Sequence, residues 1–118
     1  MPTWLPPTAA EQPSLILTNW LAFEVLIPRL DSPTLHVAGW AANEGGGRVS
    51  SPVVSIDERQ CCVVTRSGRV YALHGEPGDH PDVAYLVQQW KEGFNATLLR
   101  IATQEVQKRF HAGPPRDG

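Results

Sequence analysis

Charged residues are scarce in this chain, and neither sign dominates. Aspartate, glutamate, lysine and arginine make up 19% of the 118 residues, and the formal net charge is -2. The usual charged share is about a quarter, so a charged coiled coil is not expected. The slightly acidic balance also removes the overall attraction that draws basic proteins to duplex nucleic acid and anionic membranes. Any contact with nucleic acid must therefore come from a local basic patch.

Long apolar runs are also missing. The longest mostly apolar stretch, residues 15–30, is interrupted by Asn19, Glu24 and Arg29, which makes it too polar to cross a bilayer. The N-terminus shows no basic segment followed by an apolar leader, which is the pattern of a secretory signal. We therefore expect a cytoplasmic protein that does not bind membranes.

Cysteine is limited to the adjacent pair Cys61 and Cys62. Successive residues of a strand point to opposite faces, so a bond between these two would need a strained ring and a broken strand. The expected arrangement is one buried and one exposed thiol without a disulfide, because unpaired cysteine packs as a small apolar group. The alternative is a redox role for the pair.

Metal-binding and catalytic motifs are absent as well. The nearest approach to a ligand cluster is His74, Glu76, Asp79 and His80, whose spacing matches no zinc motif. A solvated loop in which one residue caps the following helix is the favoured explanation of these residues, and a metal site is the alternative. No Gly-x-Ser-x-Gly nucleophile motif occurs,. The sequence therefore predicts a non-enzymatic protein with no metal and no cofactor; an enzyme would need a pocket lined by His74, His80 and a cysteine.

What the chain does contain is a strong strand pattern between residues 49 and 73. Three short runs rich in β-branched and aromatic residues are separated by residues 57–60 and by Ser67-Gly68. Turn formers between such runs are typical of a three-stranded antiparallel meander. Residues 14–27 and 35–41 predict two earlier strands, the first of them broken near Asn19.

The glycine-rich residues 43–48 predict a loose connection between strands. They lack the glycine and lysine spacing of a phosphate-binding loop,. After residue 78 the apolar spacing becomes helical and predicts one helix over 81–92, with Asp79 or His80 as its cap and Gly93 as its end. A second predicted helix covers 95–110.

These elements predict a single α+β domain at residues 14–111. We expect an antiparallel curled sheet or small barrel of about five strands followed by two C-terminal helices, which cover the second apolar face of the sheet. The proline-rich residues 1–13 predict a flexible arm, and residues 112–118 predict a flexible tail.

The candidate binding residues are Trp40, Arg66, Arg69 and Tyr71. Trp40 is expected to be partly exposed, and the two arginines flank the Ser67-Gly68 turn. Exposed tryptophan and arginine are enriched in protein interfaces, which favours a protein-binding module. The alternative is a small β-barrel nucleic-acid-binding protein, in which arginines contact phosphates and aromatic side chains stack on bases. A homodimer, formed through a strand edge and a helix face, is also open.

Three segments carry a resemblance to known sequences. They are Asn19-Trp20, residues 51–57 (Ser-Pro-Val-Val-Ser-Ile-Asp) and residues 64–73 (Val-Thr-Arg-Ser-Gly-Arg-Val-Tyr-Ala-Leu). This pattern resembles small uncharacterised proteins of proteobacteria and of their phages and plasmids. The resemblance implies a compact β module carried on mobile elements. Such elements commonly encode small acidic proteins that block host defence complexes by occupying a surface, including anti-CRISPR proteins, so it also implies an inhibitor of that kind.

Overall fold

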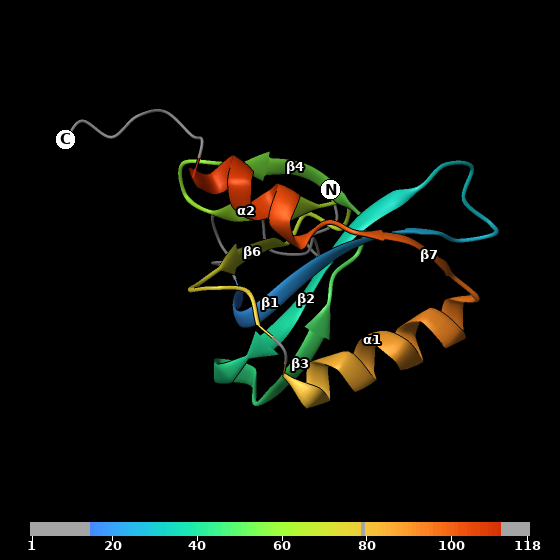
Figure 1. Cartoon of the computed structure of the whole chain (residues 1–118), viewed down its shortest axis with the longest axis horizontal. Coiled ribbons are helices and arrows are strands. Elements are labelled where there is room, and N and C mark those ends of the chain that lie inside the picture. The colour runs from blue at the N-terminus through green and yellow to red at the C-terminus, as the bar shows by residue number, and fades with distance from the viewer. Residues whose placement is uncertain (1–14, 79, 112–118) are drawn as a thin grey trace, which may run out of the picture.

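The computed structural model describes residues 15–78 and 80–111. Within them the chain forms one mixed sheet of seven strands and two α-helices (Figure 1). The elements are β1 (Leu15–Leu26), β2 (Thr34–Ala41), the 3-10 helix η1 (Ala42–Glu44), β3 (Gly46–Val49), β4 (Val53–Asp57), β5 (Cys62–Thr65), β6 (Val70–Leu73), α1 (Pro81–Phe94), β7 (Thr97–Ile101) and α2 (Thr103–His111). The predicted α+β class is therefore confirmed.

The strand β1 is long and bent, and it belongs to both halves of the sheet. Its first residues pair in parallel with β6, whereas its later residues pair antiparallel with β2 and with β7. The pairing with β2 is irregular between Thr18 and Leu21, where Asn19 has a φ of +47°. The break that the sequence predicts near Asn19 is thus a bulge that redirects one continuous strand.

The predicted meander is confirmed as β4, β5 and β6, which pair antiparallel in chain order. Its first turn is fixed by the Asp57 carboxylate, which accepts hydrogen bonds from the backbone amides of Arg59 and Gln60, each at 3.1 Å. Its second turn contains Gly68 at a φ of +88°, a conformation in which glycine is strongly favoured. Local turn chemistry therefore sets the register of this half of the sheet.

Two apolar clusters lie on opposite faces of the sheet, and β1 contributes residues to both. Successive residues of β2 show this alternation, because Val37 joins the first cluster and Ala38 the second. Ala102 and Val106 of the C-terminal part pack in the first cluster, and Val83 of α1 packs in the second. One helix thus packs on each face, whereas the sequence predicts that both helices cover the second face.

Three details of the predicted fold are wrong. The sheet is mixed and open, with seven strands instead of about five. Residues 46–49 form β3 instead of a loose loop, because they pair with β2 beneath α1, where a Cβ on Gly47 would lie 3.1 Å from Leu86 Cδ2. The segment predicted as a helix over 95–110 forms β7 followed by α2, because residues 97–101 pair with β1 as a strand.

The first helix agrees more closely with prediction. His80 caps α1 through its Nδ1 atom, which accepts a hydrogen bond from the Asp82 amide at 3.2 Å. The helix continues past Gly93 to Phe94 and ends at Asn95, which has a φ of +54°. The predicted arm and tail, residues 1–13 and 112–118, lie outside the described residues, and so does Asp79. Among the described helices none is long and apolar enough to span a membrane.

Candidate interaction surfaces

The four predicted binding residues do not form one surface. Trp40 is half-buried in β2 against the second apolar cluster, and its ring stacks on the His80 ring with centroids 4.7 Å apart and planes 6° apart. Tyr71 lies in the first cluster and is only 6% exposed. Trp40 therefore meets the helix cap, while Tyr71 packs inside the other half of the domain.

Tyr71 packs in the first apolar cluster, and its burial shifts the pKa of its hydroxyl. Burial raises the pKa of Tyr71, and the nearby positive charges of Arg69 and Arg48 partly oppose this rise. The ring is therefore not available on the sheet surface for stacking on a base. Alternation along a strand could not reveal this, because both faces of the strand carry apolar residues.

Arg66 and Arg69 do lie close together in the chain at the end of the β5–β6 hairpin. Arg66 is exposed and Arg69 is half-buried. Across the described residues neither forms an ion pair, whereas Arg48, Arg100 and Arg109 each pair with a glutamate. The two positive charges of this turn therefore remain available to a ligand.

The residues considered for metal or nucleophilic chemistry stay apart. The described residues contain no group of three or more histidine, cysteine or acidic side chains that could hold a metal ion. Cys61 is half-buried with a φ of +54° and Cys62 is buried, and they form no disulfide. The His80 ring lies on Trp40, while His74 is exposed.

An apolar surface that the sequence did not predict lies around β7. We use the name β7 surface for the exposed apolar residues of β7, which are 40–62% exposed: Leu98, Leu99 and Ile101. All five residues of β7 are exposed, and β7 pairs with β1 alone in the described part of the sheet. Large apolar side chains exposed on a strand edge are a feature of interaction sites.

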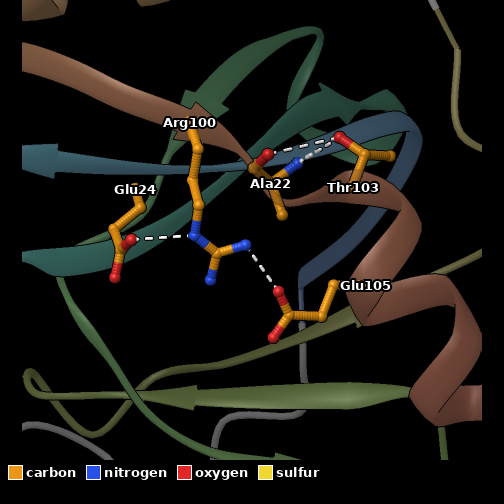
Figure 2. A network of polar contacts seen from close by, with 5 residues as sticks. All are labelled: Ala22, Glu24, Arg100, Thr103 and Glu105. Carbon is orange, nitrogen blue, oxygen red and sulfur yellow. Dashed lines mark hydrogen bonds and ion pairs between the residues drawn. The ribbon is translucent and has the colours of Figure 1, made fainter.

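A polar network fixes β7 and the start of α2 against β1 (Figure 2). The Arg100 guanidinium donates to Glu24 at 2.9 Å and to Glu105 at 2.5 Å. These hydrogen bonds raise the pKa of Arg100, and the bond to Glu105 has the larger effect. The one cation of β7 is thus paired with two glutamates of its own chain.

Thr103 completes this network at the beginning of α2. Its hydroxyl accepts a hydrogen bond from the Ala22 amide at 3.0 Å and lies 3.2 Å from the Ala22 carbonyl oxygen, to which it donates (Figure 2). The Thr103 hydroxyl thereby accepts the bond from the Ala22 amide that a backbone carbonyl of a neighbouring strand would otherwise accept, at the point where the β1–β7 pairing ends. A shallow groove of about 600 Å³ lies beside this junction, lined by Glu76, Pro77, Ile101, Thr103, Gln104 and Gln107.

The β7 surface was missed because its segment also fits a helical pattern. Leu98, Ile101 and Ala102 have the spacing of a helix face, and only the pairing with β1 shows that the first two belong to a strand. Comparison of the chain with sequence models of protein families, with curated proteins and with solved structures finds no match.

Proposed function

We propose that the protein is a non-enzymatic protein-binding module that docks a partner on the β7 surface. The observation that carries the proposal is that every residue of β7 is exposed and that three of the five are large and apolar. Burying such side chains against a partner is favourable in proportion to the apolar area removed from water.

The geometry of β7 favours contact through side chains over the addition of a new strand. Its pairing with β1 shifts register between Glu24 and Val25, so that Leu99 is an extra residue opposite β1. Bulges of this kind are one means by which edge strands avoid pairing with other strands. We therefore expect the partner to present an apolar surface instead of a free strand.

The sharper form of the proposal is an inhibitor of a host defence complex. It rests on the resemblance to small proteins of mobile elements, and the β7 surface supports it by offering a rigid apolar area that can occupy a site on another protein. Rigidity lowers the entropy that association costs, and the network of Arg100 and Thr103 supplies it here.

Two substitutions of nearly equal exposure test the β7 surface. Ile101→Lys places a charge on β7, where the side chain is 62% exposed, and Val54→Lys makes the same change on β4, where it is 59% exposed. We expect Ile101→Lys to weaken partner retention by about tenfold or more, as loss of an interface anchor does, and Val54→Lys to leave it unchanged. Retention is measured by affinity capture of the tagged protein from bacterial lysate.

The readouts separate the alternatives. Circular dichroism of both variants checks that each is folded, and sedimentation of the wild type at rising concentration tests whether the partner is a second copy. Equal retention by the two lysine variants would contradict the proposal, as would recovery of nucleic acid without protein.

A further inference from the structure

The β4–β6 half of the sheet carries apolar residues on the side that faces away from the first cluster. Ile16 of β1 pairs in register with Ala72 of β6, which in turn pairs with Cys62 of β5. Val64 and Val70 form the next pair between β5 and β6. Paired residues share a face of the sheet, and so do residues two apart along one strand. We use the name outer face for these five residues: Ile16, Cys62, Val64, Val70 and Ala72.

The outer face lies outside both apolar clusters of the described residues. Val63 and Tyr71, which alternate with its residues along β5 and β6, belong to the first cluster. The buried residues Val83 of α1 and Val106 of α2 also lie in the clusters. The two helices therefore bury their apolar side chains on other faces. A continuous apolar face of this kind is characteristic of a contact with another segment or molecule.

The sizes of the side chains suit the outer face to a large, flat occupant. Ala72 and Cys62 are small, lie side by side on neighbouring strands, and are each 8% exposed. Larger side chains lie next to them, since Ile16 is 41% exposed beside Ala72 and the half-buried Val64 and Val70 form the next pair. An aromatic ring can therefore lie on the two small side chains and contact the larger ones at its edges.

The segment best placed to reach this face is the chain that enters β1. Residues 1–14 precede the described part, and Leu15 pairs with Tyr71, one residue from Val70. Trp4 stands eleven residues before Leu15, which is a span of about 34 Å at about 3.1 Å per residue of extended proline-rich chain. The path from β1 across β6 to β5 is only about 10 Å, or two strand spacings. Trp4 can therefore reach every part of the outer face.

The composition of residues 1–13 favours contact through side chains. Trp4 and Leu5 supply large apolar groups, and Glu11 is the one charged side chain. The segment also contains four prolines, which lack an amide proton, so it cannot extend the sheet as a regular strand. Proline restricts the backbone before contact is made, and this restriction lowers the entropy that ordering costs.

We propose that residues 1–13 fold back over the outer face of their own molecule, with Trp4 packed on Cys62 and Ala72. Burial of the indole ring removes apolar area of both partners from water. The covalent link at Leu15 gives the segment an effective concentration in the millimolar range, which favours it over a second copy. A fixed cover replaces the flexible arm that the proline content predicts. The proposal does not rest on the β7 surface, and either can fail alone.

Alkylation of Cys62 measures whether the outer face is covered. In a Cys61→Ser background Cys62 is the single thiol, and its rate of reaction with iodoacetamide under native conditions reports how often the cover opens. We expect Trp4→Ala to raise this rate by about tenfold or more, because it removes much of the apolar area that holds the segment in place. Thr8→Ala, the matched change at a polar residue of the segment, should keep the rate of the background protein.

Two lysine substitutions test the face itself. Ile16→Lys places a charge on the outer face, where the side chain is 41% exposed, and Leu99→Lys makes the matched change on β7, where it is 45% exposed. We expect Ile16→Lys to raise the alkylation rate as Trp4→Ala does, and the two together to add nothing further, since both remove the same contact. Leu99→Lys should leave the rate unchanged. Circular dichroism checks that each variant is folded.

The dependence on protein concentration identifies the occupant. An alkylation rate that is the same in dilute and concentrated protein supports cover by the molecule's own segment. A rate that falls as the protein concentration rises would assign the outer face to a second copy and overturn the proposal. Equal rates in Trp4→Ala and Thr8→Ala, or a rate in Leu99→Lys as high as in Ile16→Lys, would also overturn it.

Discussion

At the scale of single residues, His36 shows how burial determines chemistry. The side chain is 1% exposed, its Nδ1 donates to the Ser50 carbonyl at 2.9 Å, and its Nε2 lies 2.8 Å from the Thr34 hydroxyl. Since the carbonyl can only accept, the neutral ring carries its proton on Nδ1 and accepts from Thr34 on Nε2. The ring also stacks on Phe23 and contacts Trp90, with centroids 5.8 and 4.7 Å away. His36 therefore joins β2 to α1 in its uncharged form.

This environment predicts a loss of stability in mild acid. Burial lowers the pKa of His36 below its ordinary 6.5. The hydrogen bond to the Ser50 backbone raises this pKa in part, and the positive charge of Arg66 lowers it further. The unfolded chain therefore binds a proton at higher pH than the folded chain, so the contribution of His36 is complete above pH 6.5 and is lost as the pH falls through the lowered folded value. We expect the urea midpoint to decrease between about pH 7.5 and about pH 5.

Two histidine variants assign this effect. His36→Gln removes the titrating ring, so the decrease in midpoint over the same pH interval should become smaller, although the variant is less stable at every pH. His74→Gln, at an exposed position, should keep the wild-type decrease. An unchanged pH dependence in His36→Gln would show that another group is responsible.

The sequence indicates the position of residues more readily than their surroundings. Arg66 and Arg69 could be placed beside a turn because Ser67-Gly68 is a local signal. The burial of Tyr71 and His36 depends on which face of the sheet each helix covers, and that is decided by segments remote in the chain. For the same reason the sequence did not show that Trp40 meets His80.

At the scale of elements, predictability follows the distance between pairing partners. The meander β4–β6 pairs with its chain neighbours, and its turns contain the residues that such turns require, so its three strands could be predicted. β3 and β7 could not, because each depends on a contact that propensity does not describe. Gly47 of β3 is needed for the close approach of Leu86 in α1. The strand β7 pairs with β1, which lies more than seventy residues earlier in the sequence.

The junction of β7 and α2 yields a prediction about Thr103. Thr103→Val keeps the shape of the side chain but removes both hydrogen bonds to Ala22, leaving a backbone amide and carbonyl of β1 with one partner fewer. We expect a loss of about 1–3 kcal/mol in the free energy of unfolding, the usual cost of an unsatisfied buried polar group. Urea denaturation measures it.

Thr97→Val is the matched control for this substitution. Thr97 begins β7, is exposed, and makes no side-chain hydrogen bond within the described residues, so its replacement should change the stability by less than about 0.5 kcal/mol. Equal losses in the two variants would show that the Thr103 hydroxyl does not hold the junction.

At the scale of the whole molecule, β1 links all the parts that the sequence suggests separately. Leu17 and Trp20 of β1 pack in the first cluster, and Phe23 and Val25 pack in the second. The close approach of Gly39 to β1, where an added Cβ would lie 2.9 Å from Leu17 Cβ, keeps β2 tightly against the bend. Neither half of the sheet can therefore separate without disrupting a strand that the other half requires.

This shared strand predicts that the domain unfolds in a single cooperative transition. Val106→Ala removes packing from the first cluster, and Val83→Ala removes it from the second, at side chains that are 2% and 0% exposed. Each should cost about 2 kcal/mol through lost burial and the cavity left behind. If β1 couples the clusters, either variant lowers the midpoint seen by far-ultraviolet circular dichroism and by tryptophan fluorescence by the same amount, since both probes report one transition. Separate shifts, with one probe following Val106→Ala and the other Val83→Ala, would instead mean that the bend at Asn19 divides the sheet into two units that unfold independently.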